Sequence, residues 1–400
     1  MSLLSAAERF AAMDRSSVAF DPKRCLHSSD RFAECDACFR ICPVEAIHPG
    51  KPPALETEKC THCLACLPVC PPGAFRAQEF LSALLNCITR CEGSAIELLC
   101  GHNPHTDRAV NPQATGLLVH DCLAGIGAGG YAALAALGLE EVTLRLDACP
   151  ACPWGSLKSA IETQVEQARL LLAPWQKEGM IRTATEAGAP SANPILDVNN
   201  PPLTRRDLIR LAARQGQVAA ARALDLQTVP GTKQPGHDRL RLLGALKHLH
   251  EPSSSCDPHL AGGNFALVSI SEACTICGAC ARACPTSAIN LDLKQEQQTF
   301  LLDFTPSLCI GCEMCIHVCE PGAVTVSHDP PFSAVFGSPA PVTLLQGFFA
   351  RCETCKAVYP ARDGTHLCPV CEYRLKNPFG SRLPSSFRKV TPQQGGERTK

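Results

Sequence analysis

Residues 60–71 read CTHCLACLPVCP, which places four cysteines in twelve residues, with two, two and three residues between successive thiols. The same spacing returns in CTICGACARACP at residues 274–285 and in CIGCEMCIHVCEP at residues 309–321. A fourth, looser group precedes the first run and ends in Cys42 and Pro43. Cysteine is therefore concentrated in a repeated local pattern, and this pattern is the main source of information about the fold.

Length and charge restrict the class of protein. At 400 residues the chain exceeds the roughly 250–300 residues of a single hydrophobic core, so we expect several domains. Its 37 basic and 38 acidic residues leave a net charge of −1, which gives no electrostatic basis for binding nucleic acid or an anionic membrane. No stretch is apolar for long enough to span a bilayer.

The first 17 residues, MSLLSAAERFAAMDRSS, lack the basic and apolar regions of a signal peptide and predict a short amphipathic helix. We therefore expect a cytoplasmic protein, in which thiols stay reduced and available to metal. The 27 cysteines fit either a disulfide framework or a metal-rich protein, and their spacing favours metal. Thiols two residues apart can wrap three thiolates around a 4Fe-4S cube, whereas zinc sites rarely place four thiols within eleven residues.

With these runs, two stretches resemble the bacterial-type two-cluster ferredoxin family. The resemblance implies dicluster domains at residues 20–80 and 264–328, with short strands around turns at residues 46–58 and 288–304. It also implies four 4Fe-4S clusters with crossed ligation, in which the last cysteine of each run binds the neighbouring cluster. The implied sets are Cys25, Cys35, Cys38 with Cys70; Cys60, Cys63, Cys66 with Cys42; Cys274, Cys277, Cys280 with Cys319; and Cys309, Cys312, Cys315 with Cys284.

Two positions depart from the spacing of that family. Nine residues, LHSSDRFAE, separate Cys25 from Cys35 where the family has two, and Glu320 stands between Cys319 and Pro321. A longer loop is tolerated because the entropy of loop closure grows slowly with length.

A different pattern spans residues 82–182, where the apolar runs AIELLC, TGLLVHDC and EEVTLRLDACP surround the helix YAALAALG. These runs predict a small α/β module with a parallel sheet, either thioredoxin-like or similar to the iron-sulfur (delta) subunit of methyl-viologen-reducing hydrogenases. The second resemblance implies an additional iron-sulfur cluster on Cys100, Cys122, Cys149 and Cys152, with Cys87 or Cys91 as alternative ligands. Buried cysteines are also common apolar side chains in sheets, so an inert α/β spacer is the competing interpretation.

The middle module also contains the dinucleotide-binding pattern G-x-G-x-x-G at Gly125, Gly127 and Gly130. Asp147 follows at the distance where such folds place a ribose-binding acid. This pattern supports an alternative function, a nicotinamide- or flavin-dependent oxidoreductase. A glycine-rich helix start that packs against a sheet is the simpler interpretation, because the first glycine does not directly follow a strand.

The last four cysteines, Cys352, Cys355, Cys368 and Cys371, form two C-x-x-C pairs typical of a tetrahedral four-thiolate site. Residues 345–377 resemble both zinc ribbons and the rubredoxin-like domain of rubrerythrins. Lys356 and Glu372 stand where rubredoxins usually carry glycine, which favours zinc over rubredoxin-type iron.

Residues 183–260 are poor in cysteine and predict a linker, AGAPSANPILDVNNPP at 187–202, and a helix at 205–224. The motif from Thr204 to Arg210 superficially resembles a twin-arginine signal but lacks the apolar run that should follow, so it predicts an ordinary helix start. The tail at residues 382–400 predicts disorder.

The predicted fold is an α+β multidomain protein, with two ferredoxin-like dicluster domains flanking a small α/β module and a C-terminal zinc-ribbon or rubredoxin-like knuckle. No residue is predicted to be catalytic. The predicted function is electron transfer, as the relay subunit of a cytoplasmic oxidoreductase complex of the hydrogenase, heterodisulfide-reductase or formate-dehydrogenase type. Expected partners are redox proteins such as hydrogenase, flavoprotein or other dehydrogenase subunits. A scaffold whose clusters only stabilise the fold is a third interpretation.

Overall fold

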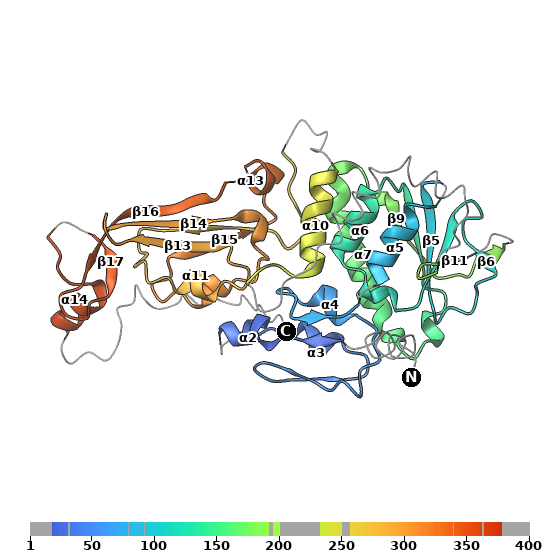
Figure 1. Cartoon of the computed structure of the whole chain (residues 1–400), viewed down its shortest axis with the longest axis horizontal. Helices are drawn as coiled ribbons and strands as arrows, with labels where there is room; N and C mark the ends of the chain where they lie inside the picture. Colours follow the sequence, from blue (N-terminus) through green and yellow to red (C-terminus); the bar gives the residue numbers. More distant parts are fainter. Residues whose placement is uncertain are drawn as a thin grey trace, which may run out of the picture.

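A computed structural model describes residues 18–30, 33–78, 80–91, 93–191, 195–200, 233–249, 257–338, 340–361 and 364–377 (Figure 1). Three sequence predictions lie outside these residues: the helix at 1–17, the helix at 205–224 with its twin-arginine-like start, and the tail at 382–400. Within them the chain mixes helices and sheets. Among the described helices, none has the length and apolar character that crossing a membrane requires.

The first cysteine-rich segment is built from short elements. Its strands form two antiparallel pairs, β1 (Ala19–Phe20) with β4 (Phe75–Arg76) and β2 (Ile47–His48) with β3 (Ala54–Leu55). Its helices are η1 (Pro22–Arg24), α2 (Leu26–Ser29), α3 (Ala37–Ile41) and α4 (Cys66–Val69). The strands predicted at residues 46–58 are thus confirmed, and α2 is made from the inserted loop between Cys25 and Cys35.

The second cysteine-rich segment repeats this order with longer strands. β12 (Ala266–Ile270) pairs antiparallel with β15 (Val324–His328), and β13 (Ile289–Lys294) forms a hairpin with β14 (Thr299–Phe304). Its helices are α11 (Ala279–Ala283), η7 (Pro306–Leu308) and α12 (Met314–His317), and α13 (Phe332–Phe336) follows. The strands predicted around a turn at residues 288–304 are confirmed.

Proline ends three of the short helices at a cysteine. The helices α3, α4 and α11 each end one residue before a cysteine that is itself followed by proline. The proline ring disfavours helical backbone in the residue before it, so Cys42, Cys70 and Cys284 are extended, with ψ of 113°, 105° and 117°. The last cysteine of each run is thereby taken out of the helix that carries the cysteine before it.

The C-terminal knuckle continues the second segment's sheet. β16 (Val342–Arg351) pairs with β14, and β17 (Val358–Pro360) pairs with β16, which gives the strand order β13-β14-β16-β17. The helix α14 (Pro369–Lys376) completes the knuckle at the far end of this sheet (Figure 1). The sheet therefore crosses the boundary that the sequence predicted between residues 328 and 345.

The sheet of the middle module is parallel, as predicted, and its strand order is β11-β7-β5-β8-β9. Its strands are β5 (Ala95–Cys100), β7 (Thr115–Val119), β8 (Glu141–Arg145), β9 (Ile181–Ala184) and β11 (Leu196–Asp197), with a side pair of β6 (Arg108–Ala109) and β10 (Ala189–Pro190). Its helices are α5 (Phe80–Ile88), η2 (Leu123–Gly125), α6 (Ala128–Ala136), η3 (Cys149–Ala151), η4 (Gly155–Leu157), α7 (Lys158–Leu172), η5 (Ala173–Trp175) and η6 (Glu178–Met180). Because β10 and β11 lie within the stretch predicted as a linker, that prediction is wrong for those residues.

A further helix, α10 (His237–His248), was not predicted and packs along α6. The Asp238 carboxylate accepts hydrogen bonds from the backbone N–H groups of Gly129 and Gly130, at 3.0 and 3.1 Å. These N–H groups have no partner within α6, since they belong to its first turn. A Cβ on Gly129 would lie 2.0 Å from the backbone oxygen of Asp238, so the close approach of α10 requires glycine there.

One large hydrophobic core joins the first cysteine-rich segment to the middle module and α10, and it also takes in Phe265 and Val335 at the two ends of the second segment; its other buried members include Leu64, Leu84, Tyr131 and Leu246. The second cysteine-rich segment and the knuckle have smaller cores of their own. The first ferredoxin-like segment and the α/β module are therefore packed as one unit.

Candidate metal centres

The structure brings together the cysteines of the set predicted around Cys25. Burial and the neighbouring thiolates of Cys35 and Cys25 raise the pKa of Cys38 to about 11. Burial raises the pKa of Cys70 to about 12, with further contributions from Cys38, Cys35 and Cys25. Cys25, despite its unusual spacing, is buried and lies with the other three. Each buried thiolate in this set raises the free energy of the others in their charged form. Such a set is suited to bind a metal centre, whose positive charge stabilises the thiolates.

Three further sets in the ferredoxin-like segments each surround a small cavity of about 20 Å³. The cysteines lining these cavities are Cys42, Cys60, Cys63 and Cys66; Cys274, Cys277, Cys280 and Cys319; and Cys284, Cys309, Cys312 and Cys315. Each group combines three cysteines of one run with the last cysteine of the other, which is the arrangement that crossed ligation requires.

The last cysteine of each run accepts a hydrogen bond from a backbone N–H four residues later. The pairs, each with an N···S distance of 3.2 Å, are Ala46 to Cys42, Ala74 to Cys70, Ala288 to Cys284 and Ala323 to Cys319. The residue before each alanine has a positive φ, from 51° to 66°; these residues are Glu45, Gly73, Ser287 and Gly322. An N–H donor stabilises a thiolate and is one determinant of cluster potential. These alanines were not predicted from the sequence, although Cys-x-x-x-Ala recurs in all four runs.

The middle module contains a cavity of the same kind. It also measures about 20 Å³, and it is lined by Cys100, Cys122, Cys149 and Cys152 together with His102 and Trp154. Cys100 ends β5, while the other three cysteines lie just beyond the ends of β7 and β8. Because these strands are parallel, their carboxyl ends meet at one edge of the sheet.

Cys122 is the buried member of this group, and the other three cysteines are half-buried. Burial raises the pKa of Cys122 to about 12, with contributions from the thiolates of Cys100, Cys63 and Cys149. The rings of His102 and Trp154 meet edge to face with centroids 4.5 Å apart. The alternative candidates Cys87 and Cys91 do not line the cavity; the Cys91 thiol donates to the Cys87 carbonyl within α5 and the turn that follows it.

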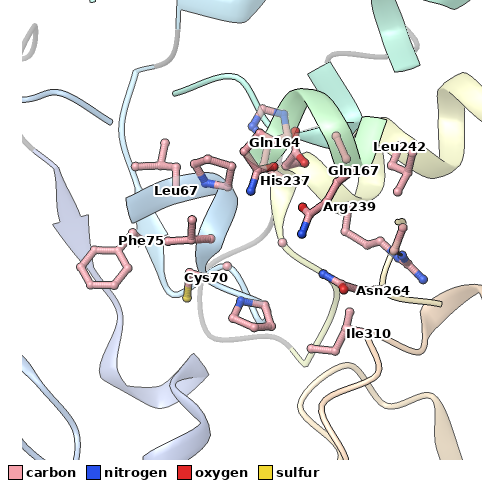
Figure 2. Close-up of a pocket in the computed structure, with 18 of the residues that line it drawn as sticks. Leu67, Cys70, Phe75, Gln164, Gln167, His237, Arg239, Leu242, Asn264 and Ile310 are labelled. Atoms are coloured by element: carbon pink, nitrogen blue, oxygen red, sulfur yellow. Dashed lines mark hydrogen bonds between the residues drawn. The ribbon is translucent and has the colours of Figure 1, made fainter. Parts of the chain in front are cut away.

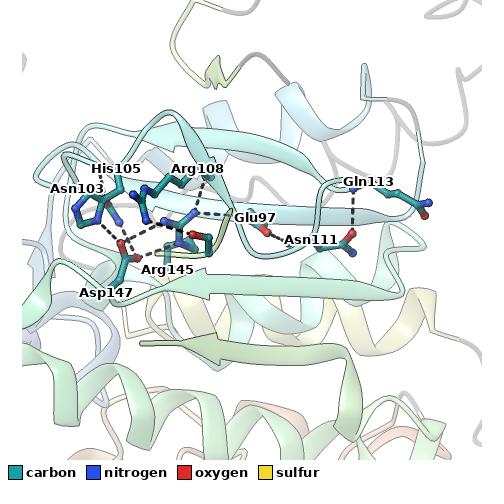
Figure 3. A network of polar contacts seen from close by, with 9 residues as sticks. Glu97, Asn103, His105, Arg108, Asn111, Gln113, Arg145 and Asp147 are labelled. Carbon is teal, nitrogen blue, oxygen red and sulfur yellow. Dashed lines mark hydrogen bonds and ion pairs between the residues drawn. The ribbon is translucent and has the colours of Figure 1, made fainter. Parts of the chain in front are cut away.

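The residues that suggested a dinucleotide site are engaged within the protein. The N–H groups of Gly129 and Gly130, at the helix start where a pyrophosphate would bind, donate to Asp238. Asp147 accepts from Arg145, Asn103 and His105 in a polar network that also includes Glu97 (Figure 3). Burial alone would raise the pKa of Asp147, but the hydrogen bonds from Arg145 and His105 lower it. The geometry therefore does not favour dinucleotide binding.

The four C-terminal cysteines form a tighter group than the others. The sulfur atoms of Cys352, Cys355, Cys368 and Cys371 all lie within 4.8 Å of one another, and those of Cys355 and Cys368 are 3.6 Å apart. Tetrahedral zinc with Zn–S bonds of about 2.3 Å places its sulfurs about 3.8 Å apart. No other group of potential ligands in the described residues is this compact. The donor set thus fits a single metal ion, whereas a cube binds each thiolate at a different corner.

Two buried arginines lie next to cysteines of different sets: Arg24 next to Cys70, and Arg239 next to Cys309. Arg24 donates to the carbonyl of Pro72 at 2.9 Å and to that of Gln234 at 2.6 Å, and its charge acts on Cys70. Arg239 donates to the carbonyl of Cys309 and lies 3.6 Å over the ring of Phe265. Burial lowers the pKa of Arg239 to about 9. Neither arginine was singled out from the sequence, because lone arginines carry no local pattern.

Comparison with known proteins identifies both cysteine-rich segments. A family model described as a 4Fe-4S dicluster domain matches residues 273–323, and one described as a 4Fe-4S binding domain matches residues 53–76. A ferredoxin from Alicyclobacillus acidocaldarius subsp. acidocaldarius is 42% identical over 45 residues, which are 11% of this chain and 58% of that ferredoxin. The chain thus carries two ferredoxin-type 4Fe-4S domains, and it spans little more than half the length of the ferredoxin it matches.

Proposed function

We propose that this chain, with its two ferredoxin-type domains, is a multi-cluster electron-transfer protein, the relay subunit of a cytoplasmic oxidoreductase complex. The hydrogenase, heterodisulfide-reductase and formate-dehydrogenase types of complex all fit such a subunit, and its partners would be other redox proteins. A bound 4Fe-4S cluster supplies reversible one-electron chemistry. The chain's own residues supply thiolates, N–H donors to sulfur and a largely buried setting for them.

The observation that carries this proposal is the equivalence of four cavities. Three lie in ferredoxin-type domains and one in the middle module, and each encloses about 20 Å³ with four cysteines on its wall. With the set of Cys25, Cys35, Cys38 and Cys70, this makes five cluster sites. The middle site therefore belongs with the ferredoxin sites rather than with inert thiols in an α/β spacer.

The C-terminal group has a different role in this proposal. Cys352, Cys355, Cys368 and Cys371 hold one tetrahedral ion, for which their sulfurs are spaced, and Lys356 and Glu372 in place of the rubredoxin glycines favour zinc over iron. Lys356 has a φ of 61°, a conformation in which glycine would be favoured, so this knuckle keeps the rubredoxin backbone turn without its glycine. The zinc site fixes the end of the sheet through β16 and β17.

The test is a metal analysis of the full chain, purified or reconstituted without oxygen. Five cubes and one zinc site predict about twenty irons, about twenty acid-labile sulfides and one zinc per chain. About sixteen irons would remove the middle site from the proposal, and eight or fewer at full occupancy would overturn the relay. A retained nicotinamide or flavin absorbance would support the alternative oxidoreductase instead.

A further inference from the structure

We infer that the loop inserted between Cys25 and Cys35 forms the contact through which electrons pass between the two ferredoxin-type domains. We call this contact the joint. Through it, the five cysteine sets form one line whose order in space differs from their order in sequence. This inference rests on the proposed function, because it assigns a route between the proposed cluster sites.

The joint is a small apolar cluster of its own. Leu26 and Ala33 come from the inserted loop of the first domain and pack with Met314 of the second, and all three are buried. Cys35 and Cys312 pack against the same cluster, one from each domain. Figure 1 shows α2, which begins at Leu26, lying against the second domain. The insertion thus places a thiol of the set around Cys25 beside a thiol of the set around Cys309.

A second contact between the same two sets is independent of the loop. Cys70 and Ile310, the residue after Cys309, line one cavity of about 310 Å³ between the domains (Figure 2). Arg239 lines the same cavity and donates a hydrogen bond to the carbonyl of Cys309. The set that contains Cys70 and the set that contains Cys309 therefore adjoin the same cavity.

The remaining neighbours complete the line. A Cβ on Gly125, three residues after Cys122, would lie 3.0 Å from the Cβ of Leu64, the residue after Cys63, so the middle module's set lies beside the set around Cys60. Within each domain the two sets are adjacent because they share a run: Cys70 directly follows α4, which begins at Cys66, and Cys284 directly follows α11, which carries Cys280. The order of the sets, each identified by one member, is Cys122, Cys63, Cys35, Cys312 and Cys277.

The two ends of this line reach the surface. Cys277 is exposed, and exposed residues Pro150, Ala151 and Pro153 surround the thiols of the opposite end. One electron passes from a reduced donor protein at one end to an oxidised acceptor protein at the other. No bond forms or breaks, and no proton is transferred. The C-terminal cysteine group packs in a separate core and lies outside the line.

Magnetic coupling between reduced clusters tests the order of the sets. An inner-pair variant of the full chain keeps only the sets around Cys35 and Cys312, through Cys60→Ser, Cys63→Ser, Cys274→Ser, Cys277→Ser, Cys149→Ser and Cys152→Ser. A matched outer-pair variant keeps the sets around Cys63 and Cys277, through Cys35→Ser, Cys38→Ser, Cys309→Ser, Cys312→Ser and the same two middle substitutions. We expect a spin–spin split EPR spectrum from the reduced inner pair and two independent spectra from the outer pair.

The outcomes separate this inference from the proposed function. About eight irons with an uncoupled inner pair would overturn the joint and leave the relay proposal standing, whereas a wild-type chain that binds no iron would overturn the proposed function. If the multiple variants fail to load, single substitutions decide. Cys312→Ser should shift the midpoint potential of the signal that Cys35→Ser abolishes, and Cys277→Ser should leave that signal unchanged. Equal effects of Cys312→Ser and Cys277→Ser would overturn the joint.

Discussion

The backbone N–H of Ala323 donates a hydrogen bond to the thiol of Cys319 over 3.2 Å. The other three runs have the same bond, yet only in this run is the cysteine followed by glutamate instead of proline. Proline is therefore not what directs the N–H to the sulfur. The shared feature is the positive φ of the residue before the alanine, which here is Gly322 with a φ of 66°.

Gly322→Ala should destabilise the loaded protein by about 1–2 kcal/mol, because a left-handed conformation is costly for a residue with a Cβ. A Cβ at this position meets no atom within 4 Å, so the effect isolates the backbone conformation. Gly179→Ala is the matched control: it also has open space around its Cβ position, and its φ is not left-handed. Chemical denaturation of both variants gives the comparison, and equal losses of stability would contradict this explanation.

Cys149→Ser with Cys152→Ser should remove about four of the irons of the full chain and leave the rest, because both thiols line the middle cavity. The control is Cys87→Ser with Cys91→Ser, two buried thiols of the same module that do not line it. Iron analysis and visible absorption report the change. An undiminished iron content in the first variant would show that the middle module is a spacer.

Arg239→Met should lower the midpoint potential of the cluster at Cys309, since a reduced cluster is stabilised by a nearby positive charge. Arg239→Lys retains the charge and should restore most of the potential. Redox titration followed by EPR measures both variants. If Arg239→Met had its full iron content and an unchanged midpoint potential, the charge of Arg239 would be screened from the cluster.

Asp238→Ala should cost about 1–2 kcal/mol of unfolding free energy, because it removes both hydrogen bonds and a negative charge from the N-terminus of α6. Asp238→Asn keeps an acceptor there and should lose less. Thermal unfolding of the loaded chain ranks the variants. If Asp238→Ala were as stable as the parent, the hydrogen bonds of Asp238 to the first turn of α6 would not contribute to stability.

The cysteine runs could be interpreted from sequence because their pattern is local: spacing, proline and the hairpins that follow lie within a few residues. The middle strands β5, β7 and β8 were predictable as short apolar runs bounded by turns. The two-residue strand β11 was not, since it lies in a Pro- and Asn-rich stretch and pairs only through the backbone of β7. The helix α10 was missed because charged residues interrupt its apolar face; among these, Arg239 and Arg241 are buried.

The arrangement of the modules could not be predicted, because it depends on contacts between distant parts of the chain. Nothing local to Leu26 or Met314 indicates that the two residues meet. The inserted loop could be seen only as a departure from ferredoxin spacing, and its contact with the second domain appears only in three dimensions. The cysteines of the middle site could be predicted to lie at strand ends. That they line a cavity like those of the ferredoxin-type domains could be seen only in the structure.

The hydrogen bonds that Asp238 accepts from α6 also affect the order in which the parts of the chain can fold during synthesis. Asp238 follows Gly129 by 109 residues along the chain, so a ribosome adding about 5–20 residues per second reaches it roughly 5–20 s after α6 has been made. During that interval the first domain and the middle module lack α10, which packs along α6 in the completed fold. Cluster insertion into the first domain can therefore precede completion of the polypeptide, whereas the joint at Met314 closes only after the second domain has been synthesised.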